Sequence, residues 1–317
     1  MKRLFSMHLV LIVSVLAILP SAAPAAESAS QKCYLLSYFL GNGEDGLRLA
    51  ASDDGLHFTM ATDRFLLKPE VGGKLMRDPS IVQAPDGTFQ MVWTTSWNDR
   101  VIGYAHSKDL IHWSKQRTIP VMMHEPKARN CWAPEVFYDA ATKRYVIVWS
   151  TTIPGRFPKT AETSESKYNH RMYYTTTRDF KEFAPTKLFY DPGYSVIDGF
   201  IAKEADRYLL FYKDERRYPE AKKVILLATA DRAEGPYTVP AEPIVPHAWV
   251  EGPSAIKLAD KWTVYFDCYT EQKYGAAVSK DLKSWTEITE QLKVPPGTRH
   301  GTVFEVDRKI LDGLKGL

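Results

Sequence analysis

Three carboxylates stand just before runs of residues that alternate as β-strands do. They are Asp78 in "RDPSI", Asp198 in "VIDGF" and Glu251 in "VEGPSA". Carboxylates gathered in one cleft raise one another's pKa, so that one stays protonated near neutral pH while another ionises. Hydrolysis of a glycosidic bond needs that division, because an acid protonates the leaving oxygen while a base activates water. These residue types therefore predict a hydrolytic site.

Two further polar residues extend the series. Glu135 occurs in "WAPEV" and His300 in "TRHGTV", and the five positions are separated by 57, 63, 53 and 49 residues. A single acidic residue at a strand end is usually a solvated loop residue. Five polar residues at regular intervals indicate equivalent positions in a structural repeat, where their side chains converge.

A repeat of strands and corners is visible across the chain. The segments "LRLAASDDGLHF", "IGYAHSKDLIHW", "MYYTTTRDFKEF" and "YGAAVSKDLKSW" share one layout, and "VILLATADRAEGPY" is a looser fifth copy. Each has a strand-like run, a Ser, Thr or Ala, an Asp and then an aromatic residue. An Asp that bonds its own turn, followed by an aromatic that fills the layer, favours a hairpin corner.

Strand, turn and strand precede four of these corners, which is typical of β-propeller blades. The sequence thus predicts an all-β, five-bladed β-propeller whose active-site funnel lies at one end of the central channel. The fifth blade would join the N-terminal "CYLLSYFL" to the late "HGTVFEV", which closes the ring and hides sheet edges. A β-sandwich is the competing architecture, but it does not explain a repeat of this length.

Residues 1–26 have the layout of a secretory signal, with Lys2 and Arg3 before a short apolar run and small residues at the end. We expect cleavage there, a secreted or periplasmic protein, and one catalytic domain over residues 27–317. An uncleaved membrane anchor is the alternative. Loss of two lysine and arginine residues lowers the formal charge from +3 to about +1, which gives no reason to expect a nucleic-acid partner. We expect a monomer that does not bind membranes once mature.

The three cysteines, Cys33, Cys131 and Cys268, match no zinc-binding spacing and allow at most one disulfide bond. We interpret them as mostly buried thiols.

The ordered set of polar motifs, from "YLLSYFLGN" to "RHGTVFEV", resembles glycoside hydrolase family 43, the propeller glycosidases of the arabinofuranosidase and xylosidase type. The resemblance implies that Asp78 is the general base and Glu251 the general acid, and that Asp198 orients Glu251 and keeps its pKa high. It also implies inversion at the anomeric carbon. His300 matches a histidine that in some members helps to hold a water or a calcium ion, so a structural calcium near His300 is an expectation, and no cofactor is required.

Substrate-binding residues are also expected. Arg77 replaces the histidine that many members have before the Asp-Pro pair, and Glu135 matches a position expected to line the pocket without doing chemistry. Trp97 and Trp132 could stack on sugar faces, or serve as blade-core aromatics. Arg216 could reach a sugar hydroxyl, or be solvated with its neighbour Arg217. The polar insertion 153–171 predicts a loop at the channel rim, or a disordered surface excursion.

The sequence thus favours a glycosidase that removes terminal arabinofuranosyl, xylosyl or galactosyl-type residues from plant-type oligosaccharides or polysaccharides. Three alternatives remain. An invertase-like hydrolase would need an N-terminal Asp-Pro-Asn motif, which "YLLSYFLGNGEDG" lacks. A sialidase would need an arginine cluster that sequence cannot show. A sugar-binding propeller with idle catalytic groups is the third.

Overall fold

The strands are organised as five antiparallel sheets, each of which is one blade. The computed structural model describes residues 32–317; the predicted leader 1–26 and the predicted start of the domain at residue 27 lie outside them. The blades, each given from its inner strand outward, are β4 (Arg77–Gln83), β5 (Phe89–Thr94), β6 (Ile102–Ser107) and β7 (Arg117–Ile119); β8 (Trp132–Asp139), β9 (Arg144–Thr152), β10 (His170–Thr177) and β11 (Lys187–Tyr190); β12 (Val196–Glu204), β13 (Arg207–Asp214) and β14 (Ile225–Ala230); β15 (Glu251–Leu258), β16 (Lys261–Cys268), β17 (Lys273–Ser279) and β18 (Thr286–Glu287); and β19 (Val303–Asp307), β1 (Lys32–Tyr38), β2 (Arg48–Ser52) and β3 (Thr59–Met60).

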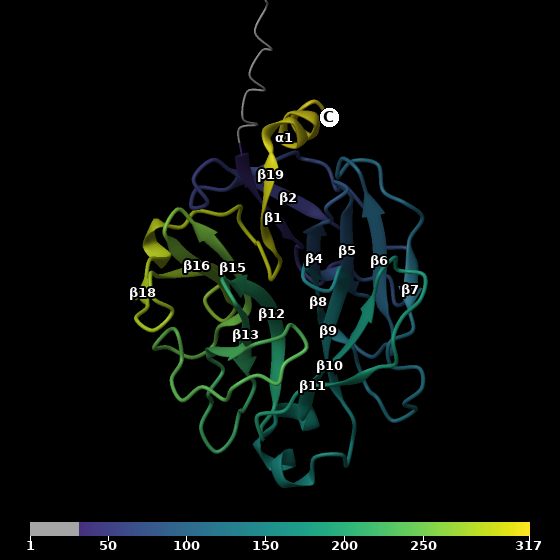
Figure 1. The fold of residues 1–317 in the computed structure, drawn as a ribbon, viewed down its shortest axis with the longest axis vertical. Helices are drawn as coiled ribbons and strands as arrows, with labels where there is room; N and C mark the ends of the chain where they lie inside the picture. The colour runs from purple at the N-terminus through teal and green to yellow at the C-terminus, as the bar shows by residue number, and fades with distance from the viewer. Residues whose placement is uncertain (1–31) are drawn as a thin grey trace, which may run out of the picture. The chain divides into compact units, whose positions relative to one another are not determined.

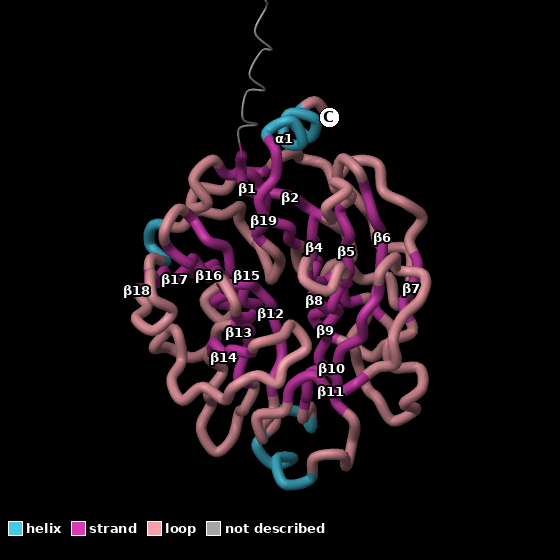
Figure 2. The backbone as a smooth tube through the Cα atoms, viewed as in Figure 1, coloured by secondary structure: helices cyan, strands magenta, loops and turns pink. Residues whose placement is uncertain are grey.

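The inner strands β4, β8, β12, β15 and β19 surround a common centre, and the outer strands and loops lie at the periphery (Figures 1 and 2). The second strand of each blade is packed on both faces by the neighbouring blades. All six residues of β5 are buried for this reason, including Trp93, whose ring covers Gly103 of the next strand. The prediction of a five-bladed β-propeller is confirmed, and the β-sandwich is excluded.

The ring is closed by the two ends of the described chain. β1 pairs with β19 in an antiparallel register that sets Leu35 opposite Phe304 and Cys33 opposite Val306. The pairing is seen in Figure 1, where β19, near the C-terminal end of the colour scale, lies beside the purple N-terminal strands. The helix α1 (Arg308–Lys315) follows β19 and buries Leu311 and Leu314. The predicted union of the first and last strands is therefore confirmed.

The aspartates in four of the five repeated corners act as the sequence predicts. Oδ1 of Asp109 accepts hydrogen bonds from the backbone N–H groups of Ile111 at 2.9 Å and His112 at 2.7 Å. The same pair of bonds is made by Asp54, Asp179 and Asp281. These corners are structural, since they fix the turn that leads out of the third strand of a blade.

A bulge interrupts the register at the mouth of four inner strands. It falls between Arg77 and Ser80 in β4, and at matching places in β8, β12 and β15. A residue with positive φ lies within each bulge: Asp78 (52°), Ala133 (46°), Asp198 (57°) and Gly252 (60°). Bulges re-aim side chains beside active sites, and left-handed backbone in residues other than glycine is uncommon. These four bulges form the rim of the central channel.

The insertion 153–171 is ordered and includes two short 3₁₀ helices, η1 (Pro158–Thr163) and η2 (Glu165–Lys167). A third, η3 (Thr289–Gln291), follows β18. The three cysteines are free and buried, as predicted. Within residues 32–317, the only α-helix falls well short of the length and apolar content that a bilayer span requires.

Candidate active site

A cavity of about 390 Å³ opens at the mouths of the inner strands. Its size is toward the lower end of the roughly 300–1,000 Å³ that ligand pockets occupy. Every blade contributes to the lining, which is mostly polar and comprises Gly41, Asn42, Arg77, Asp78, Thr94, Trp97, Trp132, Ala133, Ile197, Asp198, Glu215, Glu251, Arg299 and His300. The three predicted catalytic carboxylates, together with Arg77, Trp97, Trp132 and His300, are thus brought to one site.

Asp78 is held as a carboxylate by His300. The His300 Nδ1 lies 3.3 Å from Oδ1 of Asp78, and the Thr94 hydroxyl donates a 2.8 Å hydrogen bond to Oδ2. Burial favours the neutral acid, but these partners outweigh it and lower the pKa of Asp78 to about 2. Burial likewise opposes the charge of His300, yet Asp78 and Asp198 raise its pKa to about 9. The pair is therefore ionised across the neutral range.

Asp198, in contrast to Asp78, is favoured in its neutral, protonated form. Burial, with a further contribution from the nearby Glu251 charge, raises the pKa of Asp198 to about 7, although His300 opposes the shift. Its Oδ2 accepts a 3.0 Å hydrogen bond from the backbone N–H of Gly252. Since Gly252 directly follows Glu251, this bond ties Asp198 to the backbone that carries Glu251.

Glu251 is clamped by two cations that sequence reasoning missed. Lys213 Nζ lies 2.9 Å from its Oε2, and the Arg299 guanidinium lies 3.1 Å from its Oε1. Burial favours the neutral acid, but Lys213 and Arg299 prevail, so the pKa of Glu251 is lowered. The expectation that this pKa is kept high is therefore wrong. Arg299 is in turn held by Asp267 at 2.6 Å.

Glu135 is not part of the cavity wall, which corrects the sequence prediction. In the strand register Glu135 matches Ser80, and the residues at the mouth of β8 are Trp132 and Ala133. The Glu135 carboxyl is buried behind the wall, where it accepts a 2.6 Å hydrogen bond from the Ser80 hydroxyl. Burial raises its pKa to about 8. The even spacing of polar residues predicts that Glu135 is equivalent to Asp78, but Glu135 lies two residues beyond the equivalent position, which is Ala133.

Arg216 also lies outside the cavity lining, so its predicted contact with substrate is corrected. Its guanidinium pairs with Asp214 at 2.5 Å and lies 4.1 Å from the centre of the Tyr194 ring. These contacts occupy the side chain away from the site. Its sequence neighbour Glu215, which was not predicted, does line the cavity.

The aromatic residues at the rim form a connected group. The rings of Trp97 and Trp132 meet edge to face at 5.4 Å, and Tyr168 of the insertion packs on Trp132 at 4.7 Å. Arg77 lies 4.3 Å from the centre of the Trp97 ring. Because Tyr168 contacts a residue of the cavity lining, the insertion lies at the rim of the site, as the sequence predicts, and it is not a disordered excursion.

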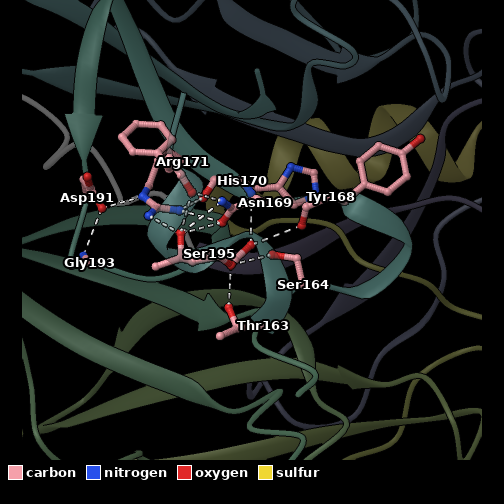
Figure 3. A network of polar contacts seen from close by, with 11 residues as sticks. Thr163, Ser164, Tyr168, Asn169, His170, Arg171, Asp191, Gly193 and Ser195 are labelled. Carbon is pink, nitrogen blue, oxygen red and sulfur yellow. Dashed lines mark hydrogen bonds and ion pairs between the residues drawn. The ribbon is translucent and has the colours of Figure 1, made fainter. Parts of the chain in front are cut away.

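A buried polar network fixes the end of the insertion (Figure 3). The Arg171 guanidinium pairs with Asp191 and donates to Asn169 Oδ1 at 3.1 Å. The Ser195 hydroxyl accepts a 3.0 Å bond from the N–H of His170, whose ring packs on Trp132 at 5.0 Å. Burial lowers the pKa of His170 to about 3, so this residue is neutral. The network supports the Trp132 wall from behind.

The described residues around His300 do not form a calcium site of the usual kind. Calcium takes six to eight oxygen ligands, whereas residues 32–317 contain no group of three or more His, Cys, Asp or Glu placed to hold a metal ion. The calcium ion that the resemblance allows stays a prediction.

Comparison with known proteins agrees with the fold. A family described as "Probable glycosyl hydrolase domain", and related to glycoside hydrolase family 43, matches residues 30–312. An alpha-L-arabinofuranosidase of Bifidobacterium longum subsp. longum is 24% identical over 241 residues, which are 68% of this chain and 22% of that protein. The chain therefore spans less than a quarter of the length of this relative.

Solved structures share the fold at low identity. An alpha-L-arabinofuranosidase from Clostridium thermocellum superposes with a TM-score of 0.59 at 11% identity, over 83% of this chain and 93% of that one. A xylan beta-1,4-xylosidase from Bacillus halodurans gives 0.52 at 18%, over 67% and 41%. A family 43 beta 1,3 galactosidase gives 0.51 at 16%, over 71% and 48%. Because the family match extends over nearly all the described residues, this chain belongs to the glycosyl hydrolases related to family 43, a class that acts on O-glycosyl bonds.

Proposed function

We propose that this protein is an exported, monomeric glycosidase that removes a terminal sugar with inversion of the anomeric carbon. The observation that carries the proposal is the electrostatic division inside one cavity. His300 holds Asp78 as a carboxylate, while the pKa of Asp198, beside Glu251, is raised to about 7. A site with one ionised carboxylate and one proton-holding pair has the base and the acid that inversion requires.

Asp78 is the proposed general base. Its carboxylate has a low pKa and is oriented by two side chains, Thr94 and His300. It would take a proton from a water molecule as that water attacks the anomeric carbon. The positive φ of Asp78 supports this role, because strained backbone is found preferentially at active sites.

Glu251 is the proposed general acid, and Asp198 is its positioning residue. The two carboxyl groups interact strongly and titrate as a pair, so that near neutral pH they share one proton. Asp198 is the favoured holder of this proton, because Lys213 and Arg299 stabilise ionised Glu251. The reaction requires that proton on Glu251, which gives it to the leaving oxygen. A bound glycoside near Glu251 would favour this state by displacing water and shifting the Arg299 contact.

The proposed substrates are terminal arabinofuranosyl, xylosyl or galactosyl-type units of plant-type glycans. The matched proteins are named for these three sugars. The cavity has a volume of about 390 Å³ and is bounded by Trp97 and Trp132, which suits the binding of one terminal sugar unit. A long open groove would instead suit the middle of a polymer. The size of the cavity thus supports action at chain ends.

The test is hydrolysis of a panel of 4-nitrophenyl glycosides of α-L-arabinofuranose, β-D-xylose and β-D-galactose by the full mature chain. Wild type is expected to release one of the sugars, with proton NMR showing the inverted anomer first. Asp78→Asn and Glu251→Gln provide the matched controls, since each keeps the shape of its side chain. Retention of the anomeric configuration would exclude the proposed mechanism. Sugar release by Asp78→Asn at the same rate as by wild type would exclude Asp78 as the base.

A further inference from the structure

Four carboxylates line the cavity, and the proposed mechanism uses three of them. The fourth, Glu215, follows β13 directly, and its backbone N–H donates a 2.9 Å bond to the Ser195 carbonyl. Only 14% of its side chain is exposed. Neither the sequence motifs nor the proposed mechanism gives Glu215 a role.

Two buried lysines hold the Glu215 carboxylate in place. Lys213 Nζ lies 2.9 Å from its Oε2, and Lys223 pairs with its Oε1. Both lysine side chains are 2% exposed. Lys213 is shared with Glu251, and Lys223 is shared with Glu165 of the insertion at 3.1 Å. An alternating row of charges therefore runs from the insertion to the proposed acid, and Glu215 is its central anion.

The placement of these charges points to a role in binding. Buried ion pairs are weak contributors to stability, because desolvation offsets most of their attraction. What the lysines do provide is a carboxylate of fixed position at the wall of a polar cavity. A carboxylate accepts hydrogen bonds through two oxygens with several lone pairs, so it can bind hydroxyl groups in addition to its lysine partners.

We propose that Glu215 binds the sugar by accepting hydrogen bonds from its hydroxyl groups, and that it selects neutral over anionic sugars. This inference rests on the proposed function, because it concerns the same cavity. The row from Glu165 to Glu251 holds three carboxylates and two lysines, so it disfavours an ionised sugar such as a uronic acid at Glu215, while a neutral polyol finds acceptors there. Glu215 is a binding residue and takes no part in bond cleavage.

Binding can be measured apart from catalysis. Wild type, Glu215→Gln and Glu165→Gln are titrated with free L-arabinose, D-xylose and D-galactose, and Trp97 and Trp132 in the lining provide a fluorescence signal. Glu165→Gln is the matched control, because Glu165 also pairs with Lys223 but is 49% exposed and outside the cavity lining. For the sugar that wild type binds, Glu215→Gln is expected to raise Kd by about 10-fold or more, as loss of a charge-assisted hydrogen bond does. Glu165→Gln is expected to stay within about twofold of wild type.

Monodeoxy analogues separate direct contact from an effect through Lys213. If Glu215 holds one hydroxyl, the analogue without that hydroxyl binds wild type weakly and shows little further loss in Glu215→Gln. An equal loss for the parent sugar and every analogue would show that Glu215 acts only through its lysines, and would overturn the proposal. So would equal binding of galactose and galacturonate by wild type, or no binding of any of the three sugars. If wild type binds a sugar but cleaves no glycoside, the proposed function fails while this assay still decides the role of Glu215.

Discussion

At the scale of single residues, the proposed base and acid differ in which charges surround them. Asp78 faces one histidine and a hydroxyl group, whereas Glu251 is clamped between a lysine and an arginine and shares its proton with Asp198. Asp78 is therefore ionised, and able to accept a proton, across the pH range in which enzymes work. The supply of the acid proton sets the upper pH limit of the reaction.

This arrangement predicts the direction of the pH dependence. The pKa of Asp198 is raised to about 7, so the Asp198–Glu251 pair holds its proton below that pH and loses it as the pH rises. The protonated pair is the active form. We therefore expect kcat/KM to be constant in mild acid and to fall about tenfold per pH unit well above 7, as measured with an aryl glycoside between pH 5 and 9.

Asp198→Asn is the informative variant for this profile. It removes the group with the raised pKa and leaves Glu251 with its two cations, which lower the pKa of Glu251. The fall in kcat/KM at high pH should then begin at a lower pH. If kcat/KM of this variant falls at the same pH as in wild type, or if the wild-type rate rises through pH 8, the two carboxyl groups do not share the catalytic proton.

Sequence reasoning found the three carboxylates because each sits in a short polar signature before a strand. It could not predict the lowered pKa of Glu251, since Lys213 comes from the neighbouring blade and Arg299 from a segment far along the sequence. Arg299 directly precedes His300 in "TRHGTV", and Lys213 lies in "YKDE". Both signals were visible, but only the fold shows that they converge on one glutamate.

At the scale of elements, the bulges at the strand mouths aim the catalytic side chains. Asp78 and Asp198 occupy the same position of their bulges, and Gly252 occupies it in β15, which leaves Glu251 one residue earlier. A Cβ at Gly252 would overlap the imidazole ring of His300. Glycine eases the positive φ, which Asp78 and Asp198 adopt as well, but it is the close approach of His300 that requires glycine there.

Gly252→Ala tests this element. The φ of 60° should cost about 1 kcal/mol of folding free energy, and displacement of the His300 ring should lower kcat/KM about tenfold or more. Gly193→Ala is the matched control, since Gly193 has a φ of 89° and open space around it. Urea unfolding and aryl-glycoside kinetics measure the two effects. Equal activity in the two variants would show that the approach of Gly252 to His300 is unimportant.

The same element explains why the sequence misplaces Glu135. Counting residues between polar signatures made Glu135 the partner of Asp78, but the register of β8 pairs Glu135 with Val148 as β4 pairs Ser80 with Val92. Blade loops differ in length, so even spacing predicts the number of blades better than it predicts the residue at each mouth. Only the hydrogen-bonded register identifies the equivalent positions.

At the scale of the whole molecule, one pairing holds the ring closed. β1 lies near the start of the described chain and β19 near its end, so this blade forms only when two distant segments pair, whereas the other four are built from consecutive strands. The repeat and both closing strands could be predicted from sequence because their alternating patterns are strong. The residues at the cavity depend on how all five blades converge, which local patterns do not specify.

Truncation tests the importance of closure. A chain that ends at residue 302 lacks β19 and α1, exposes β1 as an edge, and is expected to lose the cooperative thermal transition seen by near-ultraviolet circular dichroism. Deletion of the exposed residues 315–317 alone is the control and should leave the midpoint within about 2 °C, because these side chains contribute little buried area. An unchanged transition in the longer truncation would mean that the ring does not need this strand.

The central claim is that Glu251 gives its proton to the leaving oxygen while Asp78 activates water. The most direct test is the dependence of kcat/KM on the leaving group in Glu251→Gln. We predict a loss of about 10²–10⁴-fold with an unsubstituted phenyl glycoside and a much smaller loss with a dinitrophenyl glycoside, which leaves without acid assistance. Asp78→Asn should be impaired equally with both. A loss in Glu251→Gln that is the same for every leaving group would contradict the account.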